Sequence, residues 1–212
     1  MRRLSALLSL LTASVAGHSS AAENLIQADI CIYGGTSGGV IAAVQAARMG
    51  HSVAVIEPGR HLGGMTSGGL SWTDVGSSDR VWVLGGLARE FYVRVGKHYG
   101  HPAEKALESP DTNRESGAGY DFAKPPSLSF EPRVAEAVFR EMVKETGVRV
   151  CFEAPIRDVR KEGATIRELV TADGLRIRAK VYIDASYEGD LMAMAGVSCT
   201  LGREANAQYG ET

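Results

Sequence analysis

The stretch Asp29-Ile-Cys-Ile-Tyr-Gly-Gly-Thr-Ser-Gly-Gly-Val40 decides the fold of this 212-residue chain. Its first five residues form a short apolar run, which is typical of a buried strand. The glycines from Gly34 to Gly39 then let the backbone turn sharply into an alanine-rich helix, expected over 38–49. Gly50 ends this helix, and Ser52 to Ile56 is a second apolar run. The order strand, helix, strand with short connections predicts parallel strands and an α/β fold.

The glycine turn lies where a dinucleotide-binding loop must lie, directly after a strand and at the start of a helix. Backbone amides of the first helical turn can face a pyrophosphate, and the helix dipole favours its negative charge. Gly34 and Gly39 take the first and last glycine positions of the G-x-G-x-x-G pattern, whereas Thr36 takes the middle one. The pattern also suits a tight turn that binds no ligand. The candidate cofactor residues here are Gly34, Gly35, Thr36, Ser37, Gly38 and Gly39.

An acidic residue at the end of the second strand favours the ligand-binding interpretation. Glu57 follows Gly34 at the spacing of roughly 20 residues at which such folds carry an acidic group. A carboxylate there can accept hydrogen bonds from adenosine ribose hydroxyls, and its charge disfavours the 2′-phosphate of NADP. The alternative is a solvated carboxylate at the end of a strand. With the glycine turn, Glu57 predicts an adenosine-containing dinucleotide.

The loop Pro58-Gly-Arg-His-Leu-Gly-Gly-Met-Thr-Ser-Gly-Gly69 favours FAD over NAD. A nicotinamide enzyme needs no second phosphate-facing loop, whereas FAD is held extended along this part of the chain. Arg60 is a candidate phosphate partner, and Thr66 and Ser67 are candidate donors. A flexible surface loop is the alternative. The candidate cofactor residues of this segment are Glu57, Pro58, Arg60, Gly63, Gly64, Met65, Thr66 and Ser67.

The remaining sequence predicts helices and short strands. Helical periodicity is expected over 80–99 and 131–146, with a long irregular connection over 100–129 between them. Ala172-Asp173-Gly174 is a turn that joins two strands as a hairpin. Strand signals cover residues 148–152, 156–160, 165–171 and 175–178, and a separate apolar run covers 181–183.

Four segments together resemble the FAD-dependent oxidoreductase family of the glutathione-reductase-like type. They are Tyr33 to Ala43, Ile56 to Leu70, Phe130 to Phe139 and Tyr182 to Gly196. The resemblance runs from about Asp29 to the end of the chain. Members of this family often carry a threonine at the central glycine position, which accounts for Thr36.

This resemblance implies a Rossmann-like parallel-sheet FAD-binding domain over 28–212 with an inserted β-meander. The three strands between Ile156 and Arg178 match that meander. The segment near Ile156 would line the adenine, and Ala185 and Ser186 would approach the cofactor from a strand end. Family members are much longer, so the C-terminal part of the fold is expected to be missing.

The implied activity is transfer of hydride or electrons from a small-molecule or carbohydrate-like substrate to bound FAD. The flavin performs the redox step in such enzymes, so no catalytic side chain is assigned, and any base is expected in the missing part. Two alternatives are a truncated domain that binds FAD without turnover and an NAD-dependent dehydrogenase. The loop after Glu57 disfavours the second.

Residues 1–22 read as a signal peptide. Arg2 and Arg3 precede a short apolar stretch, and Ser20-Ala-Ala22 supplies small residues before a cleavage point. An uncleaved anchor is the alternative, and the export route is either general secretion or the twin-arginine pathway. No later segment has the pattern of a membrane span.

The net charge of −2 offers no basic footprint for nucleic acid, and the cysteines and histidines lack metal-ligand spacing.

Overall fold

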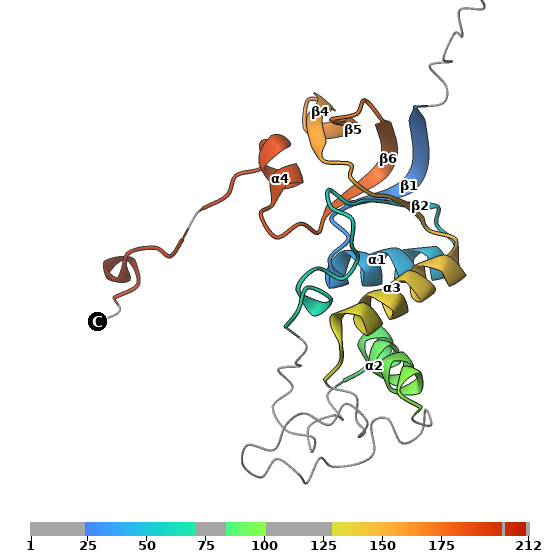
Figure 1. Cartoon of the computed structure of the whole chain (residues 1–212). Coiled ribbons are helices and arrows are strands. Elements are labelled where there is room, and N and C mark those ends of the chain that lie inside the picture. The colour runs from blue at the N-terminus through green and yellow to red at the C-terminus, as the bar shows by residue number, and fades with distance from the viewer. Residues whose placement is uncertain (1–23, 71–83, 101–128, 201, 211–212) are drawn as a thin grey trace, which may run out of the picture.

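A six-stranded sheet forms the centre of the protein, in the order β3-β2-β1-β6-β5-β4 (Figure 1). This computed structural model describes residues 24–70, 84–100, 129–200 and 202–210, so the proposed signal peptide lies outside the described residues. The strands are β1 (Leu25–Tyr33), β2 (Val53–Ile56), β3 (Arg149–Cys151), β4 (Ile156–Glu162), β5 (Thr165–Thr171) and β6 (Arg176–Asp184). β3, β2, β1 and β6 pair in parallel, and β4, β5 and β6 form an antiparallel meander. The predicted α/β fold, with its parallel strands and its meander, is confirmed.

Strand β6 corrects the expectation of two separate runs over 175–178 and 181–183. In its first half, Ile177 lies opposite Leu169 of β5 and Ile26 of β1. Its second half continues along β1 to the pair Tyr33–Asp184. The residues between the two runs, Ala179 and Lys180, include no glycine or proline that would break a strand. One strand therefore leads from the meander to the carboxyl edge of the parallel sheet.

Strand β2 and the last three residues of β1 are buried on both faces of the sheet. Successive side chains of a strand point to opposite faces, so a strand covered on both sides reads as a continuous apolar run. Burial raises the pKa of the Cys31 thiol to about 12, so this residue acts as a small core hydrophobe. One cluster, toward the meander, contains Cys31, Tyr33, Ala54, Ile56, Leu169 and Ile177, and the other contains Ile32, Ala43, Val53 and Val55.

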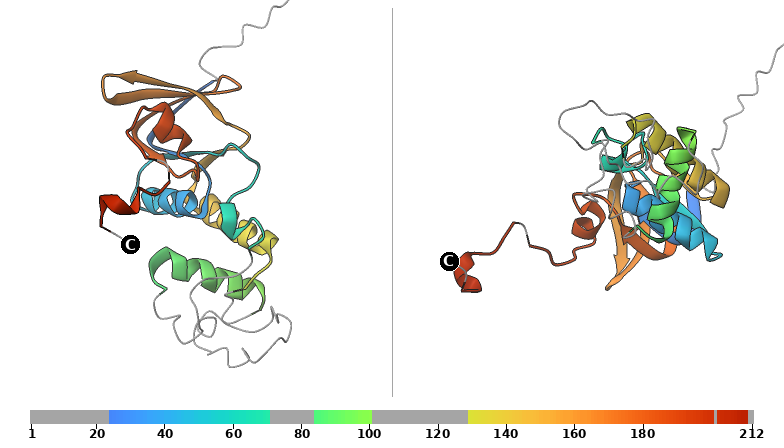
Figure 2. Two further views of the ribbon diagram at one scale, coloured as in Figure 1. Left: turned by 90° about the vertical axis from the view of Figure 1, so that its left-hand side faces the viewer. Right: turned by 90° about the horizontal axis from the view of Figure 1, so that it is seen from below.

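Helices cover one face of the parallel sheet. They are α1 (Ser37–Arg48) and α3 (Pro132–Thr146), and α2 (Gly86–His98) lies outside α3, away from the sheet (Figure 2). The fourth helix, α4 (Asp190–Met194), follows β6. As predicted, Pro132 is in the first turn of α3 and Gly147 ends it, with φ at 69°. No described helix combines the length and the apolar composition that a membrane crossing requires.

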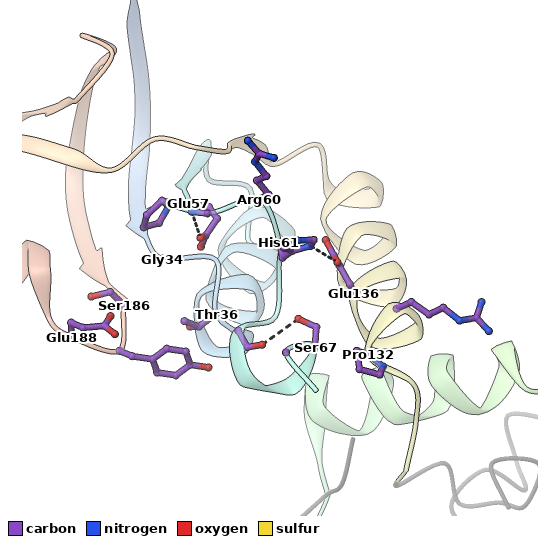
Figure 3. A pocket seen from close by; sticks show the side chains of 16 residues that line it. Gly34, Thr36, Glu57, Arg60, His61, Ser67, Pro132, Glu136, Ser186 and Glu188 are labelled. Atoms are coloured by element: carbon purple, nitrogen blue, oxygen red, sulfur yellow. Dashed lines mark hydrogen bonds and ion pairs between the residues drawn. The ribbon is translucent and has the colours of Figure 1, made fainter. Parts of the chain in front are cut away.

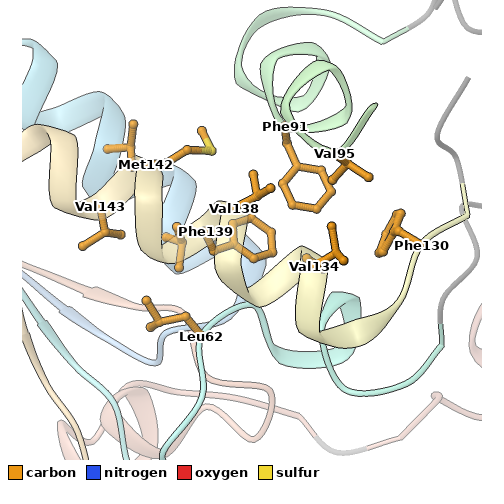
Figure 4. Packing of buried hydrophobic residues seen from close by; sticks show 12 residues of the cluster. Leu62, Phe91, Val95, Phe130, Val134, Val138, Phe139, Met142 and Val143 are labelled. Atoms are coloured by element: carbon orange, nitrogen blue, oxygen red, sulfur yellow. The ribbon is translucent and has the colours of Figure 1, made fainter. Parts of the chain in front are cut away.

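An aromatic cluster joins these helices to the second glycine loop (Figure 4). Phe91 of α2 stacks on Phe139 of α3 with ring centroids 4.5 Å apart, and Phe130 meets Phe91 edge-on at 5.7 Å. Leu62, from the loop after β2, is buried in the same cluster. The helix layer therefore anchors that loop and fixes where it can meet the glycine turn.

Candidate functional site

An open cavity of about 600 Å³ lies at the carboxyl ends of β1, β2 and β6, beside α3 (Figure 3). In open α/β sheets, ligands bind outside the carboxyl ends of the strands, so this is the expected location. The cavity is lined by Gly34, Thr36, Glu57, Pro58, Gly59, Arg60, His61, Gly64, Ser67, Gly68, Pro132, Arg133, Glu136, Ser186, Tyr187 and Glu188.

The glycine turn packs so closely that side chains are excluded. Gly34 has a left-handed φ of 98°, and a Cβ there would lie 2.7 Å from the backbone nitrogen of Ser186. A Cβ on Gly39 would overlap the carbonyl oxygen of Gly34, well inside the 3.0 Å that real Cβ atoms keep. These two glycines are therefore required by the packing of the turn on itself and on the end of β6.

Thr36, at the middle position of the glycine pattern, has a structural role of its own. It is the N-cap of α1, where its Oγ1 accepts a hydrogen bond from the Gly39 backbone nitrogen at 3.2 Å. The same hydroxyl donates to the carbonyl oxygen of Ala185 at 2.8 Å. Threonine at this position thus joins the first turn of α1 to the end of β6, which glycine could not do.

Replacing this hydroxyl tests its role. Thr36→Val removes the cap acceptor and the donor to Ala185 at nearly constant volume, so we expect the free energy of unfolding to fall by about 1–2 kcal/mol. Thr36→Ser keeps the Oγ and should remain within about 0.5 kcal/mol of the natural protein. Chemical denaturation measures both variants. Equal losses for valine and serine would show that the hydroxyl contributes nothing.

Glu57 holds two backbone amides with its two oxygens. Oε2 accepts from the Gly35 nitrogen at 2.6 Å, and Oε1 accepts from the Gly59 nitrogen at 2.6 Å. The side chain is half-buried and lines the cavity, so it is more than a solvated group at the end of a strand. A carboxylate has about four lone-pair sites, so two remain for hydroxyl donors in the cavity.

The second glycine loop lies directly against the first. The Gly63 nitrogen donates to the Gly35 carbonyl at 2.7 Å, and Thr36 and Gly63 form a parallel bridge. Gly63 has φ at 103°, and a Cβ there would lie 2.6 Å from the Phe139 ring. The loop then makes a short 3-10 turn over Gly64–Thr66. The structure therefore contains an ordered pair of glycine loops where a flexible surface loop was the alternative.

Tyr187 holds this 3-10 turn from the opposite side of the cavity. Its Oη accepts a hydrogen bond from the Met65 nitrogen at 2.7 Å, and its ring lies against Gly64. The tyrosine follows directly after Ala185 and Ser186, which the sequence predicted, yet no sequence pattern assigned it a role. The sequence feature that could have identified Tyr187 is its position three residues beyond the end of β6, at the edge of the sheet where the cavity lies.

Asp184 shapes the turn that carries Ser186 and Tyr187. One oxygen accepts from the Ser186 nitrogen at 2.9 Å and from its Oγ at 2.7 Å, and the other accepts from the Met192 nitrogen at 2.7 Å. The Ser186 Oγ in turn accepts from the Gly189 nitrogen at 3.0 Å. Sequence reasoning did not single out Asp184, although an acidic residue that ends a strand is a common turn former.

Two of the predicted phosphate-facing groups have protein partners. The Arg60 side chain is 76% exposed, and its Nη2 lies 2.6 Å from Glu153. The Ser67 hydroxyl donates to the Leu62 carbonyl at 2.5 Å, within its own loop. Both residues line the cavity, but their assignment as phosphate partners stays a prediction. His61, which was not predicted, lies in the cavity wall with Nδ1 2.8 Å from Glu136 of α3.

The predicted residues fall into three groups. Those that line the cavity are Gly34, Thr36, Glu57, Pro58, Arg60, Gly64, Ser67 and Ser186. Those in the turns and helix start that frame it are Gly35, Ser37, Gly38, Gly39, Gly63, Met65, Thr66 and Ala185. Ile156 stands apart, because it begins β4 and packs against the apolar cluster behind the sheet. Its predicted contact with adenine stays a prediction.

No group of three or more His, Cys, Asp or Glu side chains in the described ranges is arranged to hold a metal ion.

Two glycine loops joined around a carboxylate, at the carboxyl edge of a parallel sheet, define a Rossmann-like cofactor-binding domain. The sequence profile described as FAD dependent oxidoreductase matches residues 29–212. The chain therefore belongs to this family, and the family's cofactor is FAD. The finer prediction of a glutathione-reductase-like type stays a prediction.

Several solved structures share the fold of this chain. L-proline dehydrogenase from P. horikoshii matches with a TM-score of 0.55 and 18% identity over 83% of this chain and 57% of that chain. Flavin-dependent brominase Bmp2 matches with a TM-score of 0.52 and 17% identity, over 81% of this chain and 41% of that chain. A geranylgeranyl bacteriochlorophyll reductase-like protein from Thermoplasma acidophilum matches with a TM-score of 0.51 and 18% identity, over 84% of this chain and 44% of that chain. The chain thus spans little more than half of the first and less than half of the others. No curated protein matches the chain in a sequence search.

Proposed function

We propose that this chain is the FAD-binding part of an exported oxidoreductase that takes hydride or electrons from a small organic molecule. When bound, the isoalloxazine ring supplies the redox chemistry. One geometric observation carries the proposal beyond family membership: the Gly63 nitrogen donates to the Gly35 carbonyl at 2.7 Å, so the second glycine loop lies beside the first. The export part of the proposal rests on residues 1–22 of the sequence alone.

The residues around the cavity suit the parts of FAD. Glu57 has lone pairs left to accept hydrogen bonds from the adenosine ribose hydroxyls. The amides at the start of α1 would face the pyrophosphate, where the helix dipole favours negative charge. At Gly38, a Cβ would meet nothing closer than the Thr36 Oγ1 at 3.8 Å, so this side of the helix start is open. An NAD-dependent dehydrogenase would use only the first of the two loops, which makes FAD the better fit.

An absorption spectrum of the purified chain tests the proposal. FAD bound in the site is expected to give bands near about 380 and 450 nm, because these belong to the flavin itself. The chain is also expected to take up added FAD and to discriminate against NADH. A colourless protein that binds neither would contradict the proposal for this chain. Preferential binding of NADH would favour the dehydrogenase alternative.

Replacing Glu57 tests its assignment to the ribose. Glu57→Gln replaces one accepting oxygen with an NH₂ group, which can only donate. It can therefore no longer accept hydrogen bonds from both the backbone amides and a ribose hydroxyl, so we expect FAD to bind roughly ten- to a hundredfold more weakly. The control is Glu141→Gln, which makes the same charge change at an exposed position of α3 outside the cavity. Fluorescence titration with FAD measures both variants. Unchanged FAD affinity in Glu57→Gln would show that the carboxylate does not contribute to FAD binding.

A further inference from the structure

A second cavity, of about 440 Å³, lies on the meander and shares no lining residue with the cofactor cavity. It is lined by Arg160, Lys161, Glu162, Arg167, Glu168, Arg176 and Arg178. Five of these side chains are cationic and two are acidic, in a chain whose net charge is −2. Positive charge is therefore concentrated here against the overall balance of the protein.

The buried Glu168 side chain is the shared hydrogen-bond acceptor of three arginines in this cluster. It lies opposite Arg160 in the β4–β5 register, and its side chain is only 3% exposed. Its two oxygens accept hydrogen bonds from Arg160 Nη1 at 2.7 Å, from Arg176 Nε and Nη2 at 3.0 and 2.7 Å, and from Arg178 Nε at 2.7 Å. The bonds from Arg176 and then Arg178 lower the pKa of Glu168, so it is ionised at neutral pH. One buried carboxylate thus orients three guanidinium groups.

The three guanidinium groups have more donors than Glu168 can use. Arg178 hydrogen-bonds Glu168 through its Nε alone, and its two terminal nitrogens donate no hydrogen bond within the described part of the chain. Its side chain is half-exposed and lines the cavity. Three guanidinium groups against one carboxylate leave this cluster with a net charge of +2.

The surrounding charges do not cancel this excess. Arg167 pairs with Glu162 at 2.9 Å, which leaves that pair neutral. Lys161 donates to the Ala195 carbonyl, so its positive charge remains. Asp158 lies 3.4 Å from the Arg160 Nε at the rim and offsets one charge. The cavity therefore keeps a net positive charge and N–H donors that Glu168 does not use.

We propose that this cavity binds a phosphate-type oxyanion, either a soluble phosphate compound or the headgroup of an anionic lipid. Guanidinium groups recognise phosphate through paired N–H donors, and a group that is already oriented loses less freedom on binding. A doubly charged anion matches the net charge of the arginine cluster. The site is independent of FAD and of the proposed redox function, because no residue is shared between the two cavities.

Calorimetric titration of the full chain tests this site, with inorganic phosphate and pyrophosphate as probes and phosphatidic acid vesicles as a second arm. Arg178→Gln removes the partner-free donors and leaves Arg160 and Arg176 on Glu168, so we expect affinity to fall about tenfold or more. Arg157→Gln is the matched control, since Arg157 is exposed on β4 and lies outside the cavity. It should change affinity less than twofold. Circular dichroism verifies that both variants are folded.

The outcomes separate the two sources of phosphate and the failure of the proposal. Binding of free phosphate that Arg178→Gln weakens supports a soluble ligand. Binding of vesicles alone, again weakened by Arg178→Gln, supports a lipid headgroup. Absence of binding in both arms would overturn the proposal, and so would equal losses in Arg178→Gln and Arg157→Gln, which indicate unspecific charge attraction. Uptake of FAD, measured separately by absorbance, is expected to be the same in all three proteins.

Discussion

Gly39→Ala is expected to abolish FAD binding and to destabilise the domain by about 3 kcal/mol or more. The added Cβ would overlap the Gly34 carbonyl oxygen, and it would also lie 3.1 Å from the Ala185 side chain. Both neighbours belong to the framework of the cavity, so no flexible side chain can move away to make room. The turn must open, and the amides at the start of α1 then lose their orientation toward the cavity.

The neighbouring glycine provides the control for this substitution. Gly38→Ala adds the same methyl group, but its nearest neighbour is the Thr36 Oγ1 at 3.8 Å, which is ordinary van der Waals contact. Because alanine favours a helix over glycine, Gly38→Ala should leave stability unchanged or raise it by up to about 1 kcal/mol. Thermal unfolding of the two variants, followed by titration with FAD, compares them. Similar unfolding midpoints for both would contradict the close packing at Gly39.

Phe139→Ala is expected to lower the free energy of unfolding by about 3–5 kcal/mol, because it opens a large cavity in a packed core. The ring is 2% exposed and stacks on Phe91 of α2 at 4.5 Å. It also forms the wall against which Gly63 packs. We therefore expect a second effect: the second glycine loop loses its support, and FAD affinity falls with stability.

An exposed position on the same helix controls for helix propensity. Lys144→Ala should change stability by no more than about 0.5 kcal/mol, since surface substitutions away from special contacts have small effects. Urea unfolding measures both variants, and FAD titration below the unfolding transition measures the cofactor. Phe139→Ala with normal FAD affinity would show that the loop keeps its shape without the aromatic wall.

The sequence predicted the parts of the site that depend on local backbone chemistry. Gly34, Gly39 and Glu57 were identified because a tight strand-to-helix turn and a strand-end carboxylate have fixed spacings. The hydrogen bond that Glu57 accepts from the Gly59 nitrogen is local in the same sense, because the two residues are two apart in the sequence. Helix α3 was predicted for a similar reason, since its amphipathic pattern, Pro132 and Gly147 are all local signals.

Contacts between distant segments were not predictable in this way. Tyr187 meets Met65 across 122 residues of sequence, and His61 meets Glu136 across 75, so only the folded sheet brings them together. The continuity of β6 was missed because Leu175–Arg178 and Val181–Ile183 read as separate apolar runs. Its pairing with β1 over nearly the whole length of the strand, a long-range property, makes it one element.

The length of β6 has an electrical consequence. Arg178, in the arginine cluster, and Asp184, beside the cofactor cavity, belong to the same strand, and a strand rises about 3.3 Å per residue. The two residues are therefore roughly 20 Å apart, more than twice the screening distance of about 8 Å at physiological ionic strength. Solvent therefore screens most of the effect that an anion in the arginine cluster has on the cofactor cavity. The acidic and basic ends of this strand act as separate microenvironments on one rigid support.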